Sequence, residues 1–311
     1  MRENLHKTTA SAPGTLMLMG EHAVLHGHRA LCAAVDPRIA VSLHPRQDQR
    51  LRIVSALGER ETDLKSLVPS PPFAFVMEAV RRSGIRRGLT LDIQSGFSAE
   101  IGFGSSAAVT VATVAALRAA RGEPLDRAAI FEASREVLHA VQGRGSGADL
   151  AATTYGGIVL YRAKPLEIEP FVRHLPLSAH YVGYKTPTAE VIRIIDQLWA
   201  GKEDEREALF LEMDGWVAEA AHALRQGDLQ ILAHLFRAHH RKQAELGCSD
   251  ERSEQLRAAL EAHDGVLAAK ISGSGRGDCL LALGNPAATI PGFQTYPVNI
   301  TDQGVKLAET S

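Results

Sequence analysis

The sequence predicts an α+β protein with two domains. Its 311 residues are 45% hydrophobic, which is enough to bury a substantial core, and the length suits two modest domains. Strand-like and helical apolar patterns both occur along the chain. The segment from Pro165 to Pro176 carries several prolines and polar residues, as domain boundaries often do. We therefore expect an N-terminal domain over residues 1–165 and a C-terminal domain over residues 166–311.

The first third of the chain predicts mainly strands. Ala12 to Met19 reads as a buried strand, and the glycine-bounded segment GEHAVLHG, Gly20 to Gly27, reads as the loop that leaves it. In the apolar run from Ala30 to Leu43, Asp36-Pro37 predicts a turn between two strands. The next elements expected are strands over residues 50–55 and 89–94 and a helix over residues 73–83.

The stretch from Ile101 to Leu117, IGFGSSAAVTVATVAAL, predicts a loop that leads into a helix. Gly102 and Gly104 free the backbone for a tight turn in which phosphate oxygens can reach N–H groups, and the positive helix end would face the anion. A serine there can cap the helix or hold a phosphate-bound Mg²⁺. Taken alone, however, the stretch favours an ordinary N-cap before a buried helix. It matches neither the P-loop nor the dinucleotide fingerprint.

The remaining elements alternate between helices and strands. Asp126 is placed to cap a helix that extends to Val141, and Gln142 to Arg162 predicts a glycine-rich loop, a short helix and a strand. Ala268 to Leu283, AAKISGSGRGDCLLAL, reads as a strand, a glycine turn and a second strand. Between these, we expect a strand over residues 180–184 and helices over residues 187–199, 203–225, 228–246 and 253–263.

Composition limits the partners and the compartment. The net charge is −2, from 34 basic and 36 acidic side chains, so no electrostatic footprint for nucleic acid or an anionic membrane is present. Cys32, Cys248 and Cys279 are widely spaced and form no CxxC pair, which argues against a disulfide framework or a zinc site. No segment has the apolar length of a signal peptide or a membrane span. We expect a small-molecule partner and a cytoplasmic protein.

Three glycine-rich elements, PGTLMLMGEHAVLHG, IGFGSSAA and KISGSGRGDC, follow one another along the chain. Their order and spacing resemble the GHMP kinase superfamily, and within it GEHAV is most similar to the mevalonate kinases. The likeness extends from Ser11 to Leu283. It implies an N-terminal mixed α/β domain, a C-terminal ferredoxin-like domain, and ATP with Mg²⁺ in the cleft between them. Dimers are common among similar proteins, so a homodimer is also compatible with the resemblance.

The resemblance assigns the nucleotide site to two of these elements. Phosphoryl transfer needs phosphate-binding amides, a metal and a group near the attacking hydroxyl. In the family the second element binds the triphosphate, its serine matching Ser106 helps to hold Mg²⁺, and the third element closes over the phosphates. An ordinary glycine hairpin between core strands is the alternative for the third element. The matching nucleotide-binding residues are Gly102, Gly104, Ser105, Ser106, Ala107, Gly273 and Gly275.

The resemblance also assigns the reacting end of the site. Asp149, in GSGAD, matches the catalytic aspartate that accepts or orients the proton of the substrate hydroxyl; alternatively, it caps a helix starting at Leu150. Four residues match positions near the acceptor, although each of these side chains could instead brace a loop or cap a helix. They are Glu21, His22, Ser146 and Thr188.

Thr15 departs from the family pattern, because many relatives carry a lysine at this position. A lysine can stabilise phosphate charge or lower the pKa of the catalytic aspartate, and a threonine can do neither. Arg144, Arg276 and Lys185 are the candidate substitutes for this cation.

A second departure concerns the metal. Mevalonate kinases tend to place a glutamate, a second Mg²⁺ ligand, where this chain has Leu138. Glu136 lies about 200° away on an ideal helix, so it cannot simply replace that ligand. Val109 also stands where a tyrosine is common.

These departures leave several functions open. The first expectation is an ATP-dependent kinase acting on the primary hydroxyl of mevalonate. A phosphomevalonate kinase, a sugar kinase and a catalytically weakened nucleotide-binding protein are the alternatives. A purely structural protein is disfavoured, because three separate glycine loops would weaken a scaffold.

Overall fold

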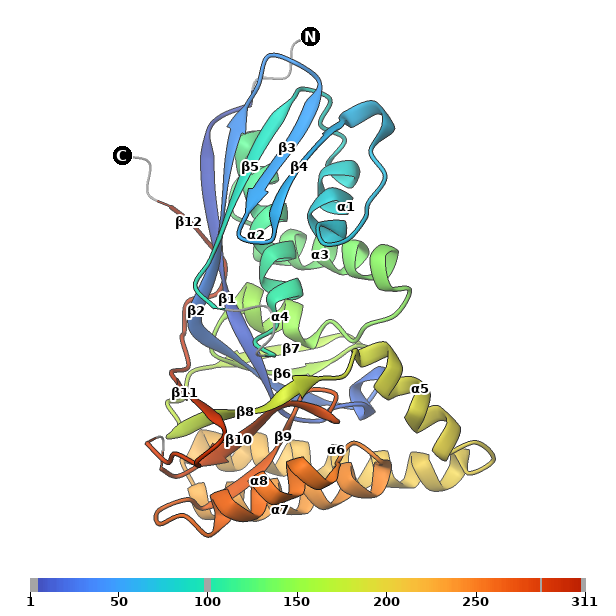
Figure 1. Cartoon of the computed structure of the whole chain (residues 1–311), viewed down its shortest axis with the longest axis vertical. Coiled ribbons are helices and arrows are strands. Elements are labelled where there is room, and N and C mark those ends of the chain that lie inside the picture. The colour runs from blue at the N-terminus through green and yellow to red at the C-terminus, as the bar shows by residue number, and fades with distance from the viewer. Residues whose placement is uncertain (1–4, 98–101, 286, 309–311) are drawn as a thin grey trace.

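The structure, a computed structural model, describes residues 5–97, 102–285 and 287–308. Two β-sheets and the helices packed on them make up these residues (Figure 1). The strands are β1 Thr8–Met19, β2 Ala30–Pro45, β3 Arg50–Ser55, β4 Gly58–Asp63, β5 Leu89–Ser95, β6 Ile158–Arg162, β7 Glu167–Phe171, β8 Leu177–Lys185, β9 Ala268–Ser272, β10 Gly277–Leu283, β11 Gln294–Val298 and β12 Lys306–Leu307. The α-helices are α1 Ala74–Ser83, α2 Ser105–Ala120, α3 Arg127–Gln142, α4 Ala148–Tyr155, α5 Thr188–Leu198, α6 Glu203–Gln226, α7 Leu229–Leu246 and α8 Glu251–Glu261. Two short 3₁₀ turns, Ala23–His26 and Leu64–Ser66, complete the described elements.

The first sheet has the strand order β12-β1-β2-β5-β3-β4, and β6 joins β2 to β7. Its described pairs are antiparallel except β3 with β5. Helices α1 to α4 lie on one side of this sheet (Figure 1). The helix α2 is buried on most of its surface, which explains its alanine, valine and threonine composition: small side chains let it pack closely in the layer.

The second sheet is antiparallel, in the order β11-β8-β10-β9, and helices α6 to α8 pack below it in the view of Figure 1. One apolar cluster joins the two sheets. Leu16 and Leu18 of β1 belong to it together with Leu177 of β8, Leu281 of β10 and Val217 of α6. The end of β1 is therefore anchored against the second sheet, and the loop that follows β1 lies at the junction of the two sheets.

Residues 299–308 return from the second sheet to the first. Strand β12 pairs with β1, with Ala10 opposite Leu307. Before it, the carbonyl of Asn299 accepts a hydrogen bond from the N–H of Asp36 at 2.9 Å. The N–H of Thr301 donates to the carbonyl of Ala34, and the carbonyl of Thr301 accepts from the N–H of Gly157. This return segment adds an edge strand to the first sheet.

The α+β fold class is confirmed, and most expected elements lie within a few residues of their observed bounds. The turn expected at Asp36-Pro37 is wrong, because β2 continues through it. The pairing of β1 with β2 passes from Pro13↔Arg38 to Gly14↔Val35, so Asp36 and Pro37 form a bulge. A bulge tolerates proline, since its unpaired residue needs no ladder N–H.

In the described part of the chain, four strands were not expected from the sequence: β4, β7, β11 and β12. Strand β4 has the sequence GERETD, whose charged side chains lack the apolar alternation of a half-buried strand, and β11 follows the third glycine-rich element. Ile101, the expected start of the glycine loop, lies outside the described residues. Strand β7 extends the first sheet beyond residue 165, and the domain division at that residue stays a prediction. In the described part of the chain, no helix has the length and apolar character required to cross a membrane.

Candidate active site

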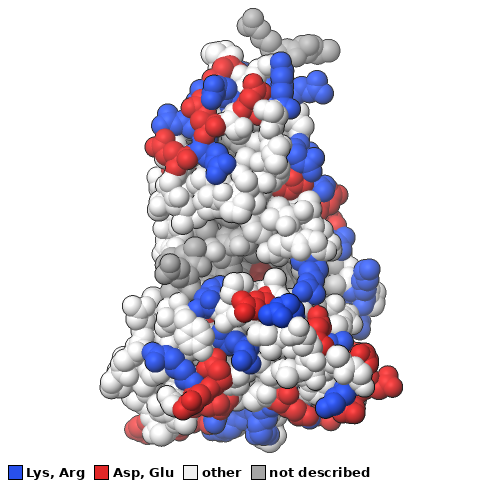
Figure 2. Space-filling model, turned by 45° about the vertical axis from the view of Figure 1, so that its right-hand side comes forward, with Lys and Arg blue, Asp and Glu red and all other residues white. Residues whose placement is uncertain are grey.

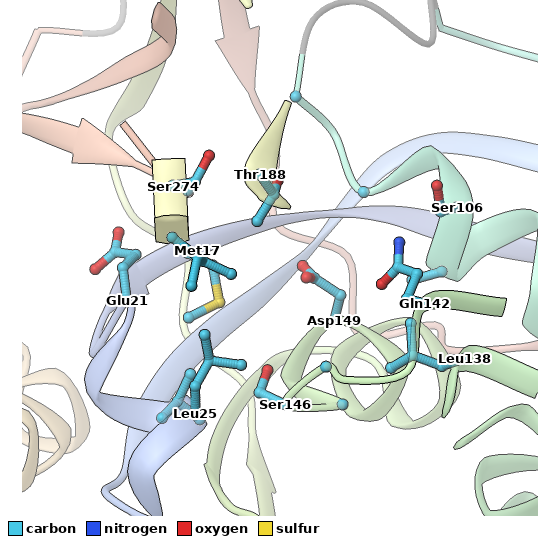
Figure 3. A pocket seen from close by; sticks show the side chains of 18 of the residues that line it. Met17, Glu21, Leu25, Ser106, Leu138, Gln142, Ser146, Asp149, Thr188 and Ser274 are labelled. Atoms are coloured by element: carbon cyan, nitrogen blue, oxygen red, sulfur yellow. The ribbon is translucent and has the colours of Figure 1, made fainter. Parts of the chain in front are cut away.

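A cavity of about 540 Å³ opens where the three glycine-rich elements converge. It is bounded by the end of β1 and the loop after it, the N-terminus of α2, the loop before α4, the start of α5 and the turn between β9 and β10. Figure 2 shows the molecule hollowed at mid-height between its upper and lower halves. Figure 3 shows the interior, with Asp149 between Ser106 on one side and Glu21 on the other. Segments far apart in the sequence therefore share one cavity.

The N-terminus of α2 forms one end of the cavity. Gly104, the N-cap, has a φ of 62° and provides no side-chain cap, so the first N–H groups of the helix face the cavity wall without one. A Cβ on Gly104 would lie 1.9 Å from the Thr15 hydroxyl oxygen, and one on Gly102 would lie 2.1 Å from Asp278 Oδ1. Both glycines are thus required for close packing. Ser105, Ser106 and Ala107 also line this end.

Asp149 lines the cavity from the first turn of α4. The alternative that it caps this helix is wrong, because the N-cap is Gly147 and Asp149 is the second helical residue. Its Oδ1 accepts a hydrogen bond from the Thr15 hydroxyl at 2.7 Å and a weak one from the Cys32 thiol at 3.5 Å. Side chains of β1 and β2 therefore hold the carboxylate in place. Thr15 supplies no positive charge, but it does supply a hydrogen bond that fixes the orientation of the carboxylate.

Two of the three candidate cations line the cavity. Lys185 Nζ lies 3.3 Å from Asp278 Oδ2, and Arg144 Nη1 lies 3.9 Å from Asp196 Oδ2. Arg276 does not line it, since its guanidinium donates to the carbonyl of Gly247 at 3.0 Å. The positive side chains at the cavity are thus already next to carboxylates.

Of the two glycines expected to bind nucleotide in the turn between β9 and β10, one lines the cavity and the other does not. Gly273 lines the cavity, whereas Gly275 packs against the backbone after α7, where a Cβ would lie 2.3 Å from the carbonyl oxygen of Cys248. Asp278 also lines the cavity and was not singled out by the sequence. Burial raises the pKa of its carboxyl, while Lys185 opposes that shift. An acidic residue directly after the glycine-rich turn was the available signal.

Glu21 lies at the opposite end of the cavity from α2 and forms a buried ion pair. Its Oε1 is 2.6 Å from Lys270 Nζ, and both side chains are almost completely buried. Burial raises the pKa of Glu21 and lowers that of Lys270, and the mutual attraction of the two groups opposes both shifts. Glu21 Oε2 has no hydrogen-bond partner among the described residues. Lys270 was missed by sequence reasoning, because nothing in a local pattern pairs residues so far apart.

His22 is fixed by the third glycine-rich element. It has a φ of 62°, and its Nε2 lies 2.8 Å from the carbonyl oxygen of Ser274. Burial lowers the pKa of His22, so the ring is neutral near pH 7 and Nε2 must carry the donated proton. Two residues before His22, the N–H of Gly20 donates to Nε2 of the buried His239 at 2.9 Å. The loop after β1 is therefore fixed by α7 at Gly20 and by the turn between β9 and β10 at His22.

The other expected acceptor residues also line the cavity. Ser146 Oγ accepts a hydrogen bond from the N–H of Ala148 at 3.2 Å, as a residue that braces its loop would do. Thr188 is the first residue of α5. Apolar side chains also line this end of the cavity, and they belong to Met17, Val24, Leu25 and Ile192. This end therefore suits a small molecule with both hydroxyl and apolar parts.

The expected second metal ligand is absent from its position. Leu138 lines the cavity, and Glu136 instead pairs with Arg82 at 2.8 Å on the outer side of α3. Among residues 5–97, 102–285 and 287–308, no group of three histidine, cysteine or acidic side chains is arranged to hold a metal by itself. Any cation at this site would need ligand oxygens from a bound phosphate.

Comparison with known proteins identifies the class. Residues 73–157 match the family described as GHMP kinases N terminal domain, and residues 220–290 match GHMP kinases C terminal. The chain is 33% identical over 278 residues to a mevalonate kinase from Archaeoglobus fulgidus, covering 88% of this chain and 91% of the relative. The chain therefore belongs to the GHMP kinase family and is an ATP-dependent phosphotransferase.

Solved structures share the fold at lower identity. The L. major mevalonate kinase, in complex with R-mevalonate, has a TM-score of 0.75 and 24% identity, with 93% of this chain and 90% of that chain covered. The Streptococcus pneumoniae phosphomevalonate kinase, in complex with phosphomevalonate and AMPPNP, has a TM-score of 0.74 and 22% identity, with 90% and 92% covered. These solved structures confirm the expected GHMP kinase-like fold.

Proposed function

We propose that this protein transfers the γ-phosphoryl group of ATP to the primary hydroxyl of mevalonate. The observation that carries the proposal is the position of Asp149, which lies in one cavity with the N-terminus of α2 and the polar loop after β1. The curated relatives that match along most of the chain are mevalonate kinases, which supports this acceptor.

In this proposal the triphosphate occupies the α2 end of the cavity. The glycine backbone and the uncapped helix N-terminus fit phosphate oxygens, because N–H groups and the helix dipole both favour an anion there. Gly102, Gly104, Ser105 and Ala107 would line the phosphates, and Gly273 would face them across the cavity. Gly275 would act only by shaping the turn.

Mg²⁺ is proposed to enter with the nucleotide. The hydroxyl of Ser106, at the N-terminus of α2, is a hard oxygen donor of the kind that Mg²⁺ accepts, and Mg²⁺ commonly relies on phosphate oxygens for its remaining ligands. When bound, the ion would neutralise charge on the transferred phosphoryl group.

Asp149 is proposed to accept or orient the proton of the acceptor hydroxyl. Because Oδ1 already accepts from Thr15, Oδ2 is the oxygen left to face the substrate. Fixing one oxygen restricts rotation of the carboxylate, which keeps the second oxygen in place as the hydroxyl approaches the phosphorus.

The acceptor is proposed to lie against Glu21, His22, Ser146 and Thr188. Mevalonate carries hydroxyl groups, a carboxylate and a methyl group, and this end of the cavity offers polar side chains for the first two and apolar side chains for the third. A phosphorylated acceptor would need additional cations. Lys185 and Arg144 each already have a carboxylate nearby, which favours the unphosphorylated acceptor.

An assay coupled to ADP release tests the acceptor directly. Purified protein with ATP and Mg²⁺ is given mevalonate, phosphomevalonate or one of a panel of hexoses at matched concentrations. We expect turnover with mevalonate at a kcat/KM at least tenfold above that for any other acceptor. A preference for phosphomevalonate or a hexose would replace the proposed acceptor while leaving the kinase class intact.

Asp149→Asn separates a kinase from a catalytically weakened nucleotide-binding protein. Removing a general base costs about 10²–10⁴-fold in kcat, and the amide keeps the shape of the side chain, so nucleotide affinity should change little. Turnover and AMP-PNP binding by calorimetry measure the two effects. The matched control is Asp126→Asn at the N-cap of α3, where asparagine also caps well. Equal turnover in both variants and the parent would argue against the role of Asp149.

A further inference from the structure

Asp278, the second residue of β10, is an unusual residue beside the cavity. It has a φ of 66°, which non-glycine residues seldom adopt, and it is only 7% exposed. Its Oδ2 lies 3.3 Å from Lys185 Nζ, whereas its Oδ1 is buried without a hydrogen-bond partner among the described residues. A buried carboxylate oxygen is costly to leave unpaired, so a missing partner is indicated.

The unpaired oxygen faces the phosphate loop. Gly102 approaches so closely that a Cβ would lie 2.1 Å from Asp278 Oδ1, and both residues line the cavity. Across this loop, Gly104 makes the same kind of approach to Thr15, which binds Asp149. Two acidic side chains therefore flank the glycine loop.

A triphosphate in this space would meet like charge. The carboxylate of Asp278 would repel phosphate oxygens unless a cation lay between them, and Lys185 is engaged on the other carboxylate oxygen. Mg²⁺ is typically held by one or two carboxylates together with substrate phosphates, which matches one free carboxylate oxygen beside a phosphate loop.

We propose that Asp278 Oδ1 is a ligand of the divalent cation that accompanies the nucleotide. It would supply a carboxylate to a cavity in which Leu138 stands at the position of the family's glutamate. Lys185 holds Oδ2 and so orients Oδ1 toward the loop. This inference rests on the proposed entry of ATP with Mg²⁺, and it is independent of which acceptor is used.

The competing explanation is that Asp278 only anchors Lys185, which would itself bind phosphate. The two explanations predict opposite effects on nucleotide binding without metal. Removing a metal ligand deletes a negative charge near the phosphates and leaves metal-free affinity equal or tighter. Removing an anchor for a phosphate-binding lysine weakens metal-free affinity.

Calorimetric titration with AMP-PNP, with and without Mg²⁺, distinguishes them. In the parent protein we expect Mg²⁺ to tighten binding. In Asp278→Asn we expect this gain to fall about tenfold, within the usual range of coupling between two ligands, with metal-free affinity unchanged or improved. Lys185→Met should weaken binding with and without metal, because it removes a positive charge from the cavity, and it should also reduce the gain, because Asp278 Oδ1 is no longer oriented. Asp196→Asn, which removes a carboxylate beside Arg144 outside the lining residues, is the matched control and should match the parent.

Asparagine tolerates the left-handed backbone, so Asp278→Asn is expected to fold. Asp278→Gly also fits a φ of 66° and provides a second variant. An unchanged Mg²⁺ gain in both variants would overturn the proposal, as would a loss of metal-free affinity parallel to that of Lys185→Met. No acceptor is present in this titration, so failure to phosphorylate mevalonate would not alter its outcome.

Discussion

Thr15 interacts with the Asp149 carboxylate through a hydrogen bond, where a lysine would interact with it through charge. A lysine there would act on Asp149 through charge, whereas the threonine hydroxyl donates a hydrogen bond of 2.7 Å to Oδ1. The hydroxyl is buried between β1 and the glycine loop, next to Gly104, where a longer side chain would need space that the loop occupies. A threonine at position 15 is therefore compatible with the close approach of the glycine loop at Gly104.

Thr15→Val is expected to lower kcat about tenfold. The variant keeps the shape of the side chain but removes a hydrogen bond to a charged group, worth about 1.5–3 kcal/mol, and part of that loss should appear in the transition state. Steady-state kinetics with the preferred acceptor measures the effect. Thr15→Ser keeps the donor and should stay near the parent. Equal kcat for valine and serine variants would show that the hydrogen bond has no role in turnover.

The buried pair of Glu21 and Lys270 should matter more for stability than for chemistry. Lys270→Met leaves the Glu21 carboxylate buried without its cation, which typically costs about 3–5 kcal/mol. The double variant Glu21→Gln with Lys270→Met removes both charges and should recover a large part of this loss. Urea denaturation measures the free energy of unfolding. Identical stability of the single and double variants would contradict a coupled ion pair.

Sequence reasoning found the residues that belong to local motifs and missed those defined by distant contacts. Asp149, Ser106 and Glu21 stand inside recognisable segments, and all three line the cavity. Lys270 lies 249 positions from its partner Glu21, so only the folded chain reveals the pair. Asp278 was not predicted, because the glycines around it indicate only a backbone turn, and no local pattern shows that its carboxylate lines the cavity.

At the scale of elements, the N-terminus of α2 depends on a glycine as its N-cap. Gly104→Ala places a Cβ 1.9 Å from the Thr15 hydroxyl oxygen, so either the loop or Thr15 must move. We expect at least a tenfold loss of AMP-PNP affinity and a lower kcat, because displacement of about an ångström can cost that much in a reacting site. Calorimetry and steady-state kinetics provide the two measurements.

Gly84→Ala is the matched control for this substitution. Gly84 ends α1 with a φ of 69°, close to the 62° of Gly104, but nothing lies within 4 Å of a Cβ there. Both variants should lose about 1–2 kcal/mol of stability from the left-handed backbone. Only Gly104→Ala should lose nucleotide affinity; an equal loss in both would mean that the close approach to Thr15 has no importance.

Strand β8 contains a histidine that should make stability depend on pH. His180 is completely buried, and its ring nitrogens lie 2.9 Å from Ser178 Oγ and 3.1 Å from Thr295 Oγ1. Burial lowers the pKa of His180 from 6.5 to about 4. Between these values the unfolded chain binds the extra proton, so this contribution is present above pH 6.5 and is lost as pH falls toward 4, by about 3 kcal/mol in total.

His180→Gln isolates this contribution, since glutamine can still hydrogen-bond but does not titrate in this range. Urea denaturation from pH 7.5 to 4.5 should show a steeper fall in the free energy of unfolding for the parent than for the variant. Other buried histidines are common to both proteins and cancel in the comparison. Parallel pH profiles would contradict a buried neutral ring at His180.

Elements were predictable where a local rule governs them. Asp126 caps α3 by accepting from the N–H of Ala129 at 3.1 Å, as its position before an amphipathic segment indicated. The bulge at Asp36-Pro37 was not predictable, because it depends on distant contacts. Strand β1 pairs with β2 on both sides of the bulge, and the carbonyl of Asn299 accepts a hydrogen bond from the N–H of Asp36. Strand β4 is a strand because it pairs with β3, and no local pattern in its charged sequence indicates that pairing.

At the scale of the whole molecule, two sheets share one cavity because β1 belongs to the first sheet and its end packs on the second. The sequence predicted the α+β class from alternating patterns and the family from three motifs. It did not predict the return of residues 299–308 to the first sheet, since a two-residue strand such as β12 carries almost no periodicity. Long-range closure of this kind is set by tertiary contacts.

This return segment affects how the protein can fold during synthesis. Strand β1 leaves the ribosome long before β12, and Ala10 and Ser11 gain their partners only when Leu307 and Lys306 arrive. At about 5–20 residues per second, synthesis of the residues between these two strands takes many seconds. A nascent chain therefore exposes an unpaired strand edge for many seconds, and such edges attract other chains. Chaperone binding to nascent β1 would be a direct consequence of the position of β12.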